Sequence, residues 1–307
     1  MPSLKELGAK EELLAGGHTS CPGCGYPALI RLALLTAKDP VVVAAATGCL
    51  EVNTTIYPYT SWKVPFLHNA FENAAATLSG VEAAYKSLRR QSKIKDRKIK
   101  FIAFGGDGGT YDIGLQSLSG AMERGHDMLY ICYDNGAYMN TGIQRSGATP
   151  KYAATTTAPA GKVKQGKEEF RKDLTEIMVA HGIPYVAQTI SGSWMDFTKK
   201  VEKALAVDGP AFINVLTVCP LGWGTDPAIG PKLTQVAADT CFWPMYEVVD
   251  GEYKITYTPR EKKAVTEWLK PQVRFKHLFK PGNEALLLEL QADVDKRWER
   301  LQRKAEK

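Results

Sequence analysis

The sequence predicts an α/β fold in which a doubly wound, mostly parallel sheet carries helices on both faces. Three observations support this prediction. Short apolar segments of strand length alternate with helical segments along most of the chain. The first apolar segment, Val41–Ala46, has no polar residue, which is typical of a strand buried on both faces. With 307 residues, of which 44% are hydrophobic and 23% charged, the chain can bury a sizeable core.

The elements follow one another in a regular order. Helices are expected over residues 1–17, 26–38, 69–88, 113–124, 168–181 and 195–206. Pro27 suits a first helical turn, Asp39-Pro40 ends that helix, and Gly125 closes the helix over 113–124. Strands are expected over residues 41–46, 100–104, 128–133, 185–189 and 211–218. Residues 52–67 are predicted to form an irregular aromatic loop. Residues 140–167 are predicted to form a long loop, and such loops are usually functional.

The pattern changes near residue 240. A two-stranded ribbon is expected over 246–257, followed by helices over 259–269 and 283–304. We therefore expect an α/β domain over 1–240 and a C-terminal extension over 241–307, packed on the same domain or on a partner subunit.

Charge and cysteine content limit the class of protein. The net charge of +6 is modest, and its two basic runs, 93–100 and 297–307, lack a regular aromatic stripe. We therefore expect an acidic protein partner rather than nucleic acid. No signal segment is visible and the longest apolar run is too short to span a bilayer, so we expect a cytoplasmic protein without membrane contact. Six cysteines are too few for a disulfide scaffold, which leaves thiolates available as metal ligands.

Four chemically distinctive residues each follow an expected strand. They are Cys49, Asp107, Asn135 and Cys219. Ligands of open α/β sheets bind at the carboxyl ends of parallel strands. We therefore expect these side chains to face one crevice.

The stretch around Asp107 indicates a metal–diphosphate site. Gly106, Gly108 and Gly109 flank the carboxylate, and glycines let the backbone approach a phosphate. A carboxylate suits Mg²⁺ bridging a diphosphate. Asn135, 28 residues further on, can add an amide oxygen, and Ala137 a carbonyl oxygen. Two ordinary turns are the alternative interpretation.

The cysteines suggest a second metal site. Cys21 and Cys24 form a CxxC loop that is compatible with zinc, an iron–sulfur cluster or a place in the core. Zinc sites usually pair two such knuckles, and no second one is present. One CxxC loop with two isolated cysteines, Cys49 and Cys219, fits a [4Fe–4S] cluster better. Cys132 is expected in the core and Cys241 has no assigned role.

These motifs resemble a known family. The spacing of GDG and Asn135 looks like the thiamine diphosphate motif. The stretch GGDGGTYDIGLQSLSGAMERGH…YDNGAYMNTGIQRSGATP resembles the β subunits of pyruvate:ferredoxin oxidoreductase and related 2-oxoacid:ferredoxin oxidoreductases. The likeness extends to residues 18–25, 47–51 and 274–279 and so covers nearly the whole chain.

The resemblance implies a set of cofactors and ligands. The fold would be the thiamine diphosphate-binding, pyrophosphate-domain type. Mg²⁺ would be held by Asp107, Asn135 and the Ala137 carbonyl, and the diphosphate by backbone N–H groups near Gly108–Thr110. Asn140 would lie close to the thiazolium and the substrate, as a catalytic residue that stabilises a developing oxyanion. The family's cluster-binding cysteines match Cys21, Cys24, Cys49 and Cys219.

The resemblance also implies a reaction and partners. The reaction would be oxidative decarboxylation of pyruvate to acetyl-CoA and CO₂, with one-electron transfers through the [4Fe–4S] cluster to ferredoxin. The glutamate that activates thiamine comes from the α subunit in this family, and neither Glu51 nor Glu72 lies in a matching motif. The chain would therefore carry only half of the active site. It would work in a complex with α, γ and δ subunits and would use coenzyme A.

Three alternatives stay open at this point. The same architecture could act on oxalate, phenylglyoxylate or branched 2-oxoacids. The chain could be a non-oxidative thiamine-dependent decarboxylase subunit. It could also be a zinc-stabilised binding module without catalysis.

Overall fold

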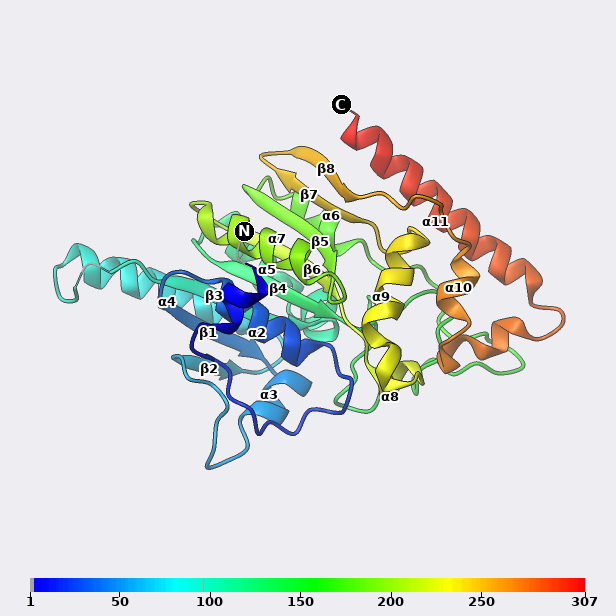
Figure 1. Cartoon of the computed structure of the whole chain (residues 1–307), viewed down its shortest axis with the longest axis horizontal. Coiled ribbons are helices and arrows are strands. Elements are labelled where there is room, and N and C mark those ends of the chain that lie inside the picture. Colours follow the sequence, from blue (N-terminus) through cyan, green and yellow to red (C-terminus); the bar gives the residue numbers. More distant parts are fainter. Residues whose placement is uncertain (1–2, 96, 307) are drawn as a thin grey trace.

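The computed structural model describes residues 3–95 and 97–306, so the first two residues of the helix expected over 1–17 lie outside it. Its centre is an eight-stranded sheet of order β2-β1-β3-β4-β6-β5-β7-β8 (Figure 1). The strands are β1 (Val41–Ala46), β2 (Phe66–Asn69), β3 (Lys100–Gly106), β4 (Leu129–Asp134), β5 (Tyr185–Ile190), β6 (Ala211–Leu216), β7 (Met245–Val249) and β8 (Glu252–Tyr257). Strands β1 to β6 pair parallel with one another, β7 pairs antiparallel with β5, and β8 pairs antiparallel with β7. The predicted doubly wound, mostly parallel fold is confirmed.

Helices cover both faces of the sheet. They are α1 (Leu4–Gly8), α2 (Tyr26–Thr36), α3 (Cys49–Thr54), α4 (Ala74–Arg90), α5 (Leu115–Glu123), α6 (Leu174–Val179), α7 (Trp194–Ala206), α8 (Pro220–Trp223), α9 (Gly230–Asp239), α10 (Val265–Leu269) and α11 (Glu284–Ala305). A π-helix, η1 (Gly108–Ile113), and two 3₁₀ helices, η2 (Pro227–Ile229) and η3 (Val273–Phe279), complete the set.

The sheet separates two hydrophobic cores. Successive residues of a strand point to opposite faces, so Val43 and Ala45 join the core under α2 and α7, while Ala44 joins the other core. That second core also receives α4, α5, α9, α10 and α11. The C-terminal ribbon extends the same sheet, because β7 pairs with β5. None of the helices in residues 3–95 and 97–306 has the length and apolar character needed to cross a membrane.

Several expected elements differ in the structure. The helix expected over 1–17 is only Leu4–Gly8, because the chain then runs extended and Leu14 forms an antiparallel bridge with Trp62. The loop expected over 52–67 contains the start of β2. Since Asn69 ends that strand opposite Ala46, the helix expected from residue 69 begins only at Ala74.

Tertiary contacts explain why a third expected helix is shorter than predicted. The helix expected over 168–181 is reduced to Leu174–Val179. Arg171 turns inward to the buried carboxylate of Asp134, and Lys172 donates to the carbonyl oxygen of Tyr111. These polar contacts hold the backbone before residue 174 out of the helix. The expected helix over 259–269 is likewise only Val265–Leu269, while α3, α8 and α9 were not predicted.

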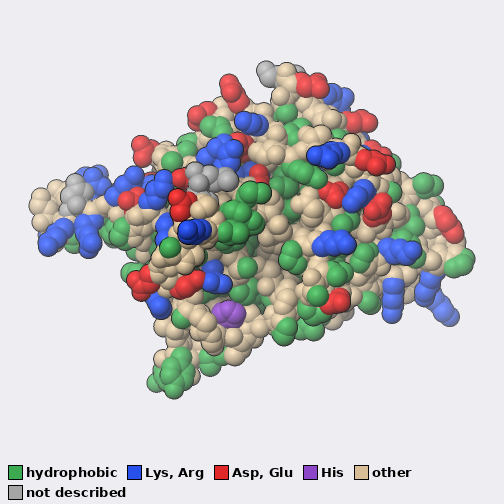
Figure 2. All heavy atoms as spheres, viewed as in Figure 1, with side chains coloured by type: hydrophobic (Ala, Val, Ile, Leu, Met, Phe, Trp, Pro, Cys, Tyr) green, Lys and Arg blue, Asp and Glu red, His purple; other side chains and the backbone are tan. Residues whose placement is uncertain are grey.

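One end of α4 projects beyond the sheet (Figure 1). Basic side chains gather on this projection (Figure 2), and they are exposed. They are Lys86, Arg89, Arg90, Lys93, Lys95, Arg97 and Lys98. We call this surface the basic arm.

Candidate functional site

The expected crevice lies at the carboxyl edge of four adjacent parallel strands. In the sheet order, β1, β3, β4 and β6 are neighbours, and Cys49, Asp107, Asn135 and Cys219 follow them in turn. A pocket of about 350 Å³ opens at this edge. Its lining includes eight expected residues: Cys49, Gly106, Asp107, Gly108, Gly109, Asn135, Ala137 and Asn140.

Asp107 lies at the start of the π-helix and is buried. Its Oδ1 accepts from the backbone N–H of Asn135 at 3.3 Å, and its Oδ2 accepts from the Ser146 hydroxyl at 2.5 Å. Burial raises the pKa of the Asp107 carboxyl, and the negative charge of Asp134 adds to this effect. A bound cation would favour the charged form, so the carboxylate fits a metal site.

Three polar groups converge beside the pocket. With its nitrogen turned towards them, the Asn135 side-chain amide donates to Asp107 Oδ1 at 3.0 Å and to the Ala137 carbonyl oxygen at 3.0 Å. With its oxygen turned towards them, the same amide would present a third acceptor to a cation. Neighbouring oxygen ligands of an octahedral Mg²⁺ at roughly 2.1 Å are separated by about 3 Å. The same three groups therefore suit a divalent cation in kind and in spacing.

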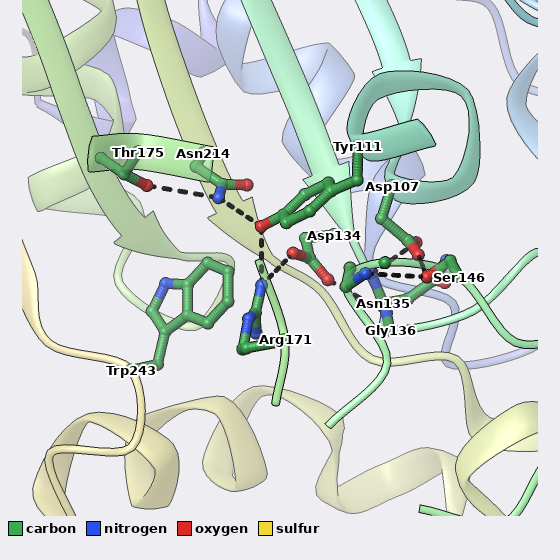
Figure 3. A network of polar contacts seen from close by, with 12 residues as sticks. Asp107, Tyr111, Asp134, Asn135, Gly136, Ser146, Arg171, Thr175, Asn214 and Trp243 are labelled. Atoms are coloured by element: carbon green, nitrogen blue, oxygen red, sulfur yellow. Dashed lines mark hydrogen bonds and ion pairs between the residues drawn. The ribbon is translucent and has the colours of Figure 1, made fainter. Parts of the chain in front are cut away.

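A buried polar network supports the strand end that carries Asn135 (Figure 3). Arg171 donates to Asp134 Oδ2 at 2.5 Å and to the Tyr111 hydroxyl at 2.6 Å. The Asn214 amide donates to the same hydroxyl at 2.7 Å. The guanidinium of Arg171 also lies 4.4 Å from the centre of the Trp243 ring. These contacts connect five segments of the sequence beside the strand end that precedes Asn135.

The long loop expected over 140–167 closes around the same support. Ser146 reaches Asp107, and the Thr149 hydroxyl donates to the Gly136 carbonyl at 2.7 Å. Lys167 is buried and donates to the Thr149 carbonyl at 2.7 Å. Burial lowers the pKa of Lys167 to about 8, and the positive charges of Arg145 and Arg171 act in the same direction.

The carbonyl of Asn135 has its own partners. Trp223 Nε1 donates to it at 2.6 Å, and Arg274 contacts it at 3.4 Å. The Arg274 guanidinium stacks 4.2 Å from the Trp223 ring. Burial lowers the pKa of Arg274, while the negative charges of Asp134 and Cys219 act in the opposite direction. The C-terminal extension therefore contributes directly to the support of the candidate metal ligand.

The four expected cluster cysteines come from three segments in contact with each other. Gly25 N–H donates to the Val218 carbonyl at 3.3 Å, and the Tyr26 hydroxyl donates to the Cys49 carbonyl at 3.1 Å. All four thiols are free. Burial raises the pKa of Cys24 to about 12, and the charges of Cys219, Cys49 and Cys21 add to this shift.

The cysteines are close enough to influence one another but do not form a finished metal site. In residues 3–95 and 97–306, no group of three or more His, Cys, Asp or Glu side chains is arranged to hold a metal ion. The donor set matches an iron–sulfur cluster in chemical kind. Binding one would require the thiols to move towards each other. The assignment of these four ligands stays a prediction.

Asn140 lines the pocket beside the candidate cysteine site. Burial raises the pKa of Cys49 to about 11, and the Asn140 side chain acts in the opposite direction. Cys49 itself lines the pocket. A group bound in the pocket would therefore be next to one of the cluster cysteines.

The pocket lining differs in part from the expected set of residues. Thr110 is not among the residues that line the pocket, and its hydroxyl bonds to the Gly106 carbonyl and the Tyr130 hydroxyl. Among the described residues that line the pocket, Asp107 is the only carboxylate, and neither Glu51 nor Glu72 belongs to the lining. Residues that the sequence did not single out also line it: Thr47, Gly48, Phe71, Tyr133, Tyr138, Met139 and Thr141. Cys132 is buried in the core as expected.

Comparison with known proteins identifies the class and then the family. Residues 46–215 match the C-terminal TPP-binding domain of thiamine pyrophosphate enzymes, so the chain belongs to this class of protein. The chain is 52% identical to pyruvate synthase subunit PorB of Thermotoga maritima, with 97% of this chain and 93% of that protein covered. It is 56% identical to pyruvate synthase subunit PorB of Methanocaldococcus jannaschii, over 88% of this chain and 91% of that protein.

The chain therefore belongs to the β-subunit family of pyruvate:ferredoxin oxidoreductases, as the sequence motifs indicated. Among solved structures, a 2-oxoglutarate:ferredoxin oxidoreductase from Magnetococcus marinus matches with a TM-score of 0.56 and 23% identity. It covers 67% of each chain and supports the fold.

Proposed function

We propose that this β subunit binds thiamine diphosphate through Mg²⁺ and takes part in the oxidative decarboxylation of pyruvate to acetyl-CoA and CO₂. The observation that carries this proposal is the convergence of the Asp107 carboxylate, the Asn135 amide and the Ala137 carbonyl at a pocket that Cys49 also lines. Bound thiamine would supply a carbanion that attacks the 2-oxo carbon of the substrate.

The residues around Asp107 would hold the diphosphate end. Asp107, Asn135 and the Ala137 carbonyl are the proposed Mg²⁺ ligands. Gly108 and Gly109 leave no room for a side chain, because a Cβ on Gly108 would lie 2.2 Å from the Tyr138 ring and one on Gly109 would lie 2.9 Å from the Phe71 carbonyl. Both glycines line the pocket, where their backbone can approach a bound phosphate. Asn140 lies across the pocket, where its amide can donate to a developing oxyanion.

Cys21, Cys24, Cys49 and Cys219 are the proposed ligands of a [4Fe–4S] cluster, which would accept electrons one at a time and pass them towards ferredoxin. Cys49 lines the pocket, which supports a short route from the pocket to this cluster. A zinc-stabilised binding module would have no need for a pocket beside its cysteines.

The chain would act only together with its α subunit. Thiamine activation needs a carboxylate, and the only one among the described lining residues is Asp107, which is proposed to bind the metal. We therefore infer that α supplies the activating glutamate, with γ and δ subunits, coenzyme A and ferredoxin completing the cytoplasmic enzyme. The basic arm supports association with an acidic partner surface.

Anaerobic purification tests the proposal. The chain should be brown, with about four irons per chain. It should show no turnover alone and gain pyruvate- and coenzyme A-dependent ferredoxin reduction when the α, γ and δ subunits are added. A panel of pyruvate, oxalate, phenylglyoxylate and branched 2-oxoacids then ranks the substrates. A colourless chain with one zinc would refute the oxidoreductase proposal, and full turnover by the β chain alone would refute the shared site.

A further inference from the structure

The loop between α3 and β2 carries a group of exposed hydrophobic side chains at its tip. Tyr57 and Tyr59 are 94% and 78% exposed, and Ile56 is 47% exposed. The loop projects from the molecule, and hydrophobic side chains gather at its end (Figure 2). A single exposed hydrophobic residue is ordinary, but a contiguous group of them marks an interaction site. We call residues 55–60 the aromatic finger.

The aromatic finger stands on a rigid base. The backbone N–H of Ser61 donates to the Thr54 carbonyl at 2.8 Å, and Trp62 Nε1 donates to the Thr54 hydroxyl at 2.9 Å. The Trp62 ring is buried in the core under α2. At the tip, the N–H of Tyr59 donates to the Ile56 carbonyl at 2.7 Å. Because these contacts fix the loop before a partner binds, little conformational entropy remains to be lost on binding.

The finger lies next to the pocket. Helix α3 begins at Cys49, which lines the pocket, and ends at Thr54, at the base of the finger. A helix rises by about 1.5 Å per residue, so Thr54 lies about 8 Å along the axis from Cys49. A partner subunit that reaches over Cys49 into the pocket is therefore within reach of the finger.

The pocket requires such a partner. Asp107 is the only carboxylate among the described residues of the lining and is proposed to bind the metal, so the activating carboxylate has to come from another chain. A membrane fits the finger less well, because residues 55–62 contain no Lys or Arg to attract anionic lipids. A second copy also fits less well, because each copy carries a net charge of +6 and the two repel each other.

We propose that the aromatic finger anchors the partner subunit that brings the activating carboxylate to the pocket. The inference rests on the proposed function and adds which surface holds the α subunit there. The partner offers an apolar recess for the rings of Tyr57 and Tyr59, with hydrogen-bonding groups for their hydroxyls. Tyrosine provides a large contact area at a low cost in side-chain entropy, and it is frequent among the residues that dominate binding.

The test measures binding of the purified α subunit to the full β chain by biolayer interferometry under anaerobic conditions. Tyr57→Ala and Tyr59→Ala should each weaken binding by at least about tenfold. Both variants should unfold in urea like wild type, because their exposed side chains are not part of the core. Leu288→Ala is the matched control, since Leu288 on α11 is 71% exposed and lies outside the finger. The control should bind the α subunit like wild type.

Photo-cross-linking identifies the neighbour of the finger directly. With p-benzoylphenylalanine in place of Tyr57, irradiation of the assembled complex should join the β chain to the α subunit. Cross-links to γ, δ or a second β chain without any to α would overturn the inference.

The binding results separate this inference from the proposed function. If wild-type β does not bind the α subunit, the proposed shared active site is wrong and the inference is overturned with it. If wild type binds and both tyrosine variants bind equally well, only the inference is overturned. The inference is also refuted if the variants bind α like wild type and lose self-association in sedimentation, or lose binding to vesicles of phosphatidylcholine and phosphatidylserine.

Discussion

Replacing Arg171 by methionine should destabilise the chain strongly, although Arg171 lies in a segment without regular secondary structure. Its guanidinium pairs with Asp134 at 2.5 Å, and the two side chains are 6% and 0% exposed. Arg171→Met leaves the Asp134 charge buried, with the Gly136 N–H at 3.0 Å as a remaining donor. Breaking a buried pair in this way costs about 3–5 kcal/mol, out of a total stability of about 5–15 kcal/mol.

The neighbouring residue provides a matched control. Lys172 also forms an ion pair, with Asp112 at 2.6 Å, but its side chain is 43% exposed. Because solvent screens exposed pairs, Lys172→Met should cost no more than about 1 kcal/mol. Urea unfolding of the cofactor-free chain at pH 7, followed by tryptophan fluorescence, measures both variants. The double variant Asp134→Asn/Arg171→Met should recover part of the loss, because the buried charge is gone.

The result that refutes this reasoning is a loss for Arg171→Met no larger than that for Lys172→Met. The buried ion pair would then make no more difference to stability than an exposed one. Thiamine diphosphate affinity gives a second measure. It should fall in Arg171→Met, since Asp134 immediately precedes the proposed ligand Asn135.

Three further predictions concern the cofactors and pH. Asp107→Asn should lower thiamine diphosphate affinity, measured by calorimetry with Mg²⁺, by more than about tenfold. The same change should leave the cofactor-free chain equally or more stable, because it removes a buried charge, and a loss in stability would contradict this. Cys219→Ser should lower the iron content after reconstitution while Cys241→Ser keeps it, and equal iron in both would exclude Cys219 as a ligand. Lys167 has a folded pKa of about 8, below its unfolded value. Between these two values the unfolded chain binds more protons, so wild type should gain stability relative to Lys167→Met as the pH rises from about 8 to about 10. A flat difference would show that the pKa of Lys167 is not lowered.

The sequence predicted the sheet and its functional edge because these depend on local patterns. Apolar segments of strand length, each followed by a polar turn, are enough to place Asp107 and Asn135 on one edge once parallel pairing is assumed. The glycine-rich turn around Asp107 is also a local signal, since it indicates phosphate binding whatever residues lie far away in the sequence.

The parts that the sequence did not predict depend on contacts between distant residues. Ser146 bonds Asp107 across 39 positions, and Arg171 bonds Asp134 across 37 positions. No local pattern marks either residue. The helix expected over 168–181 was wrong for the same reason, since a buried ion pair outweighs helix propensity. In the sequence, Tyr133 looks like any other residue of an apolar strand. Only the structure shows that its buried hydroxyl has no hydrogen-bond partner.

The contact of Arg274 with the Asn135 carbonyl has a consequence for biosynthesis. The two residues are 139 positions apart, and Arg274 joins the support only after η3 has been made. A ribosome will therefore have synthesised most of this chain before the support of the proposed metal ligand Asn135 is complete. We expect thiamine diphosphate to bind at full affinity only late in translation or after it.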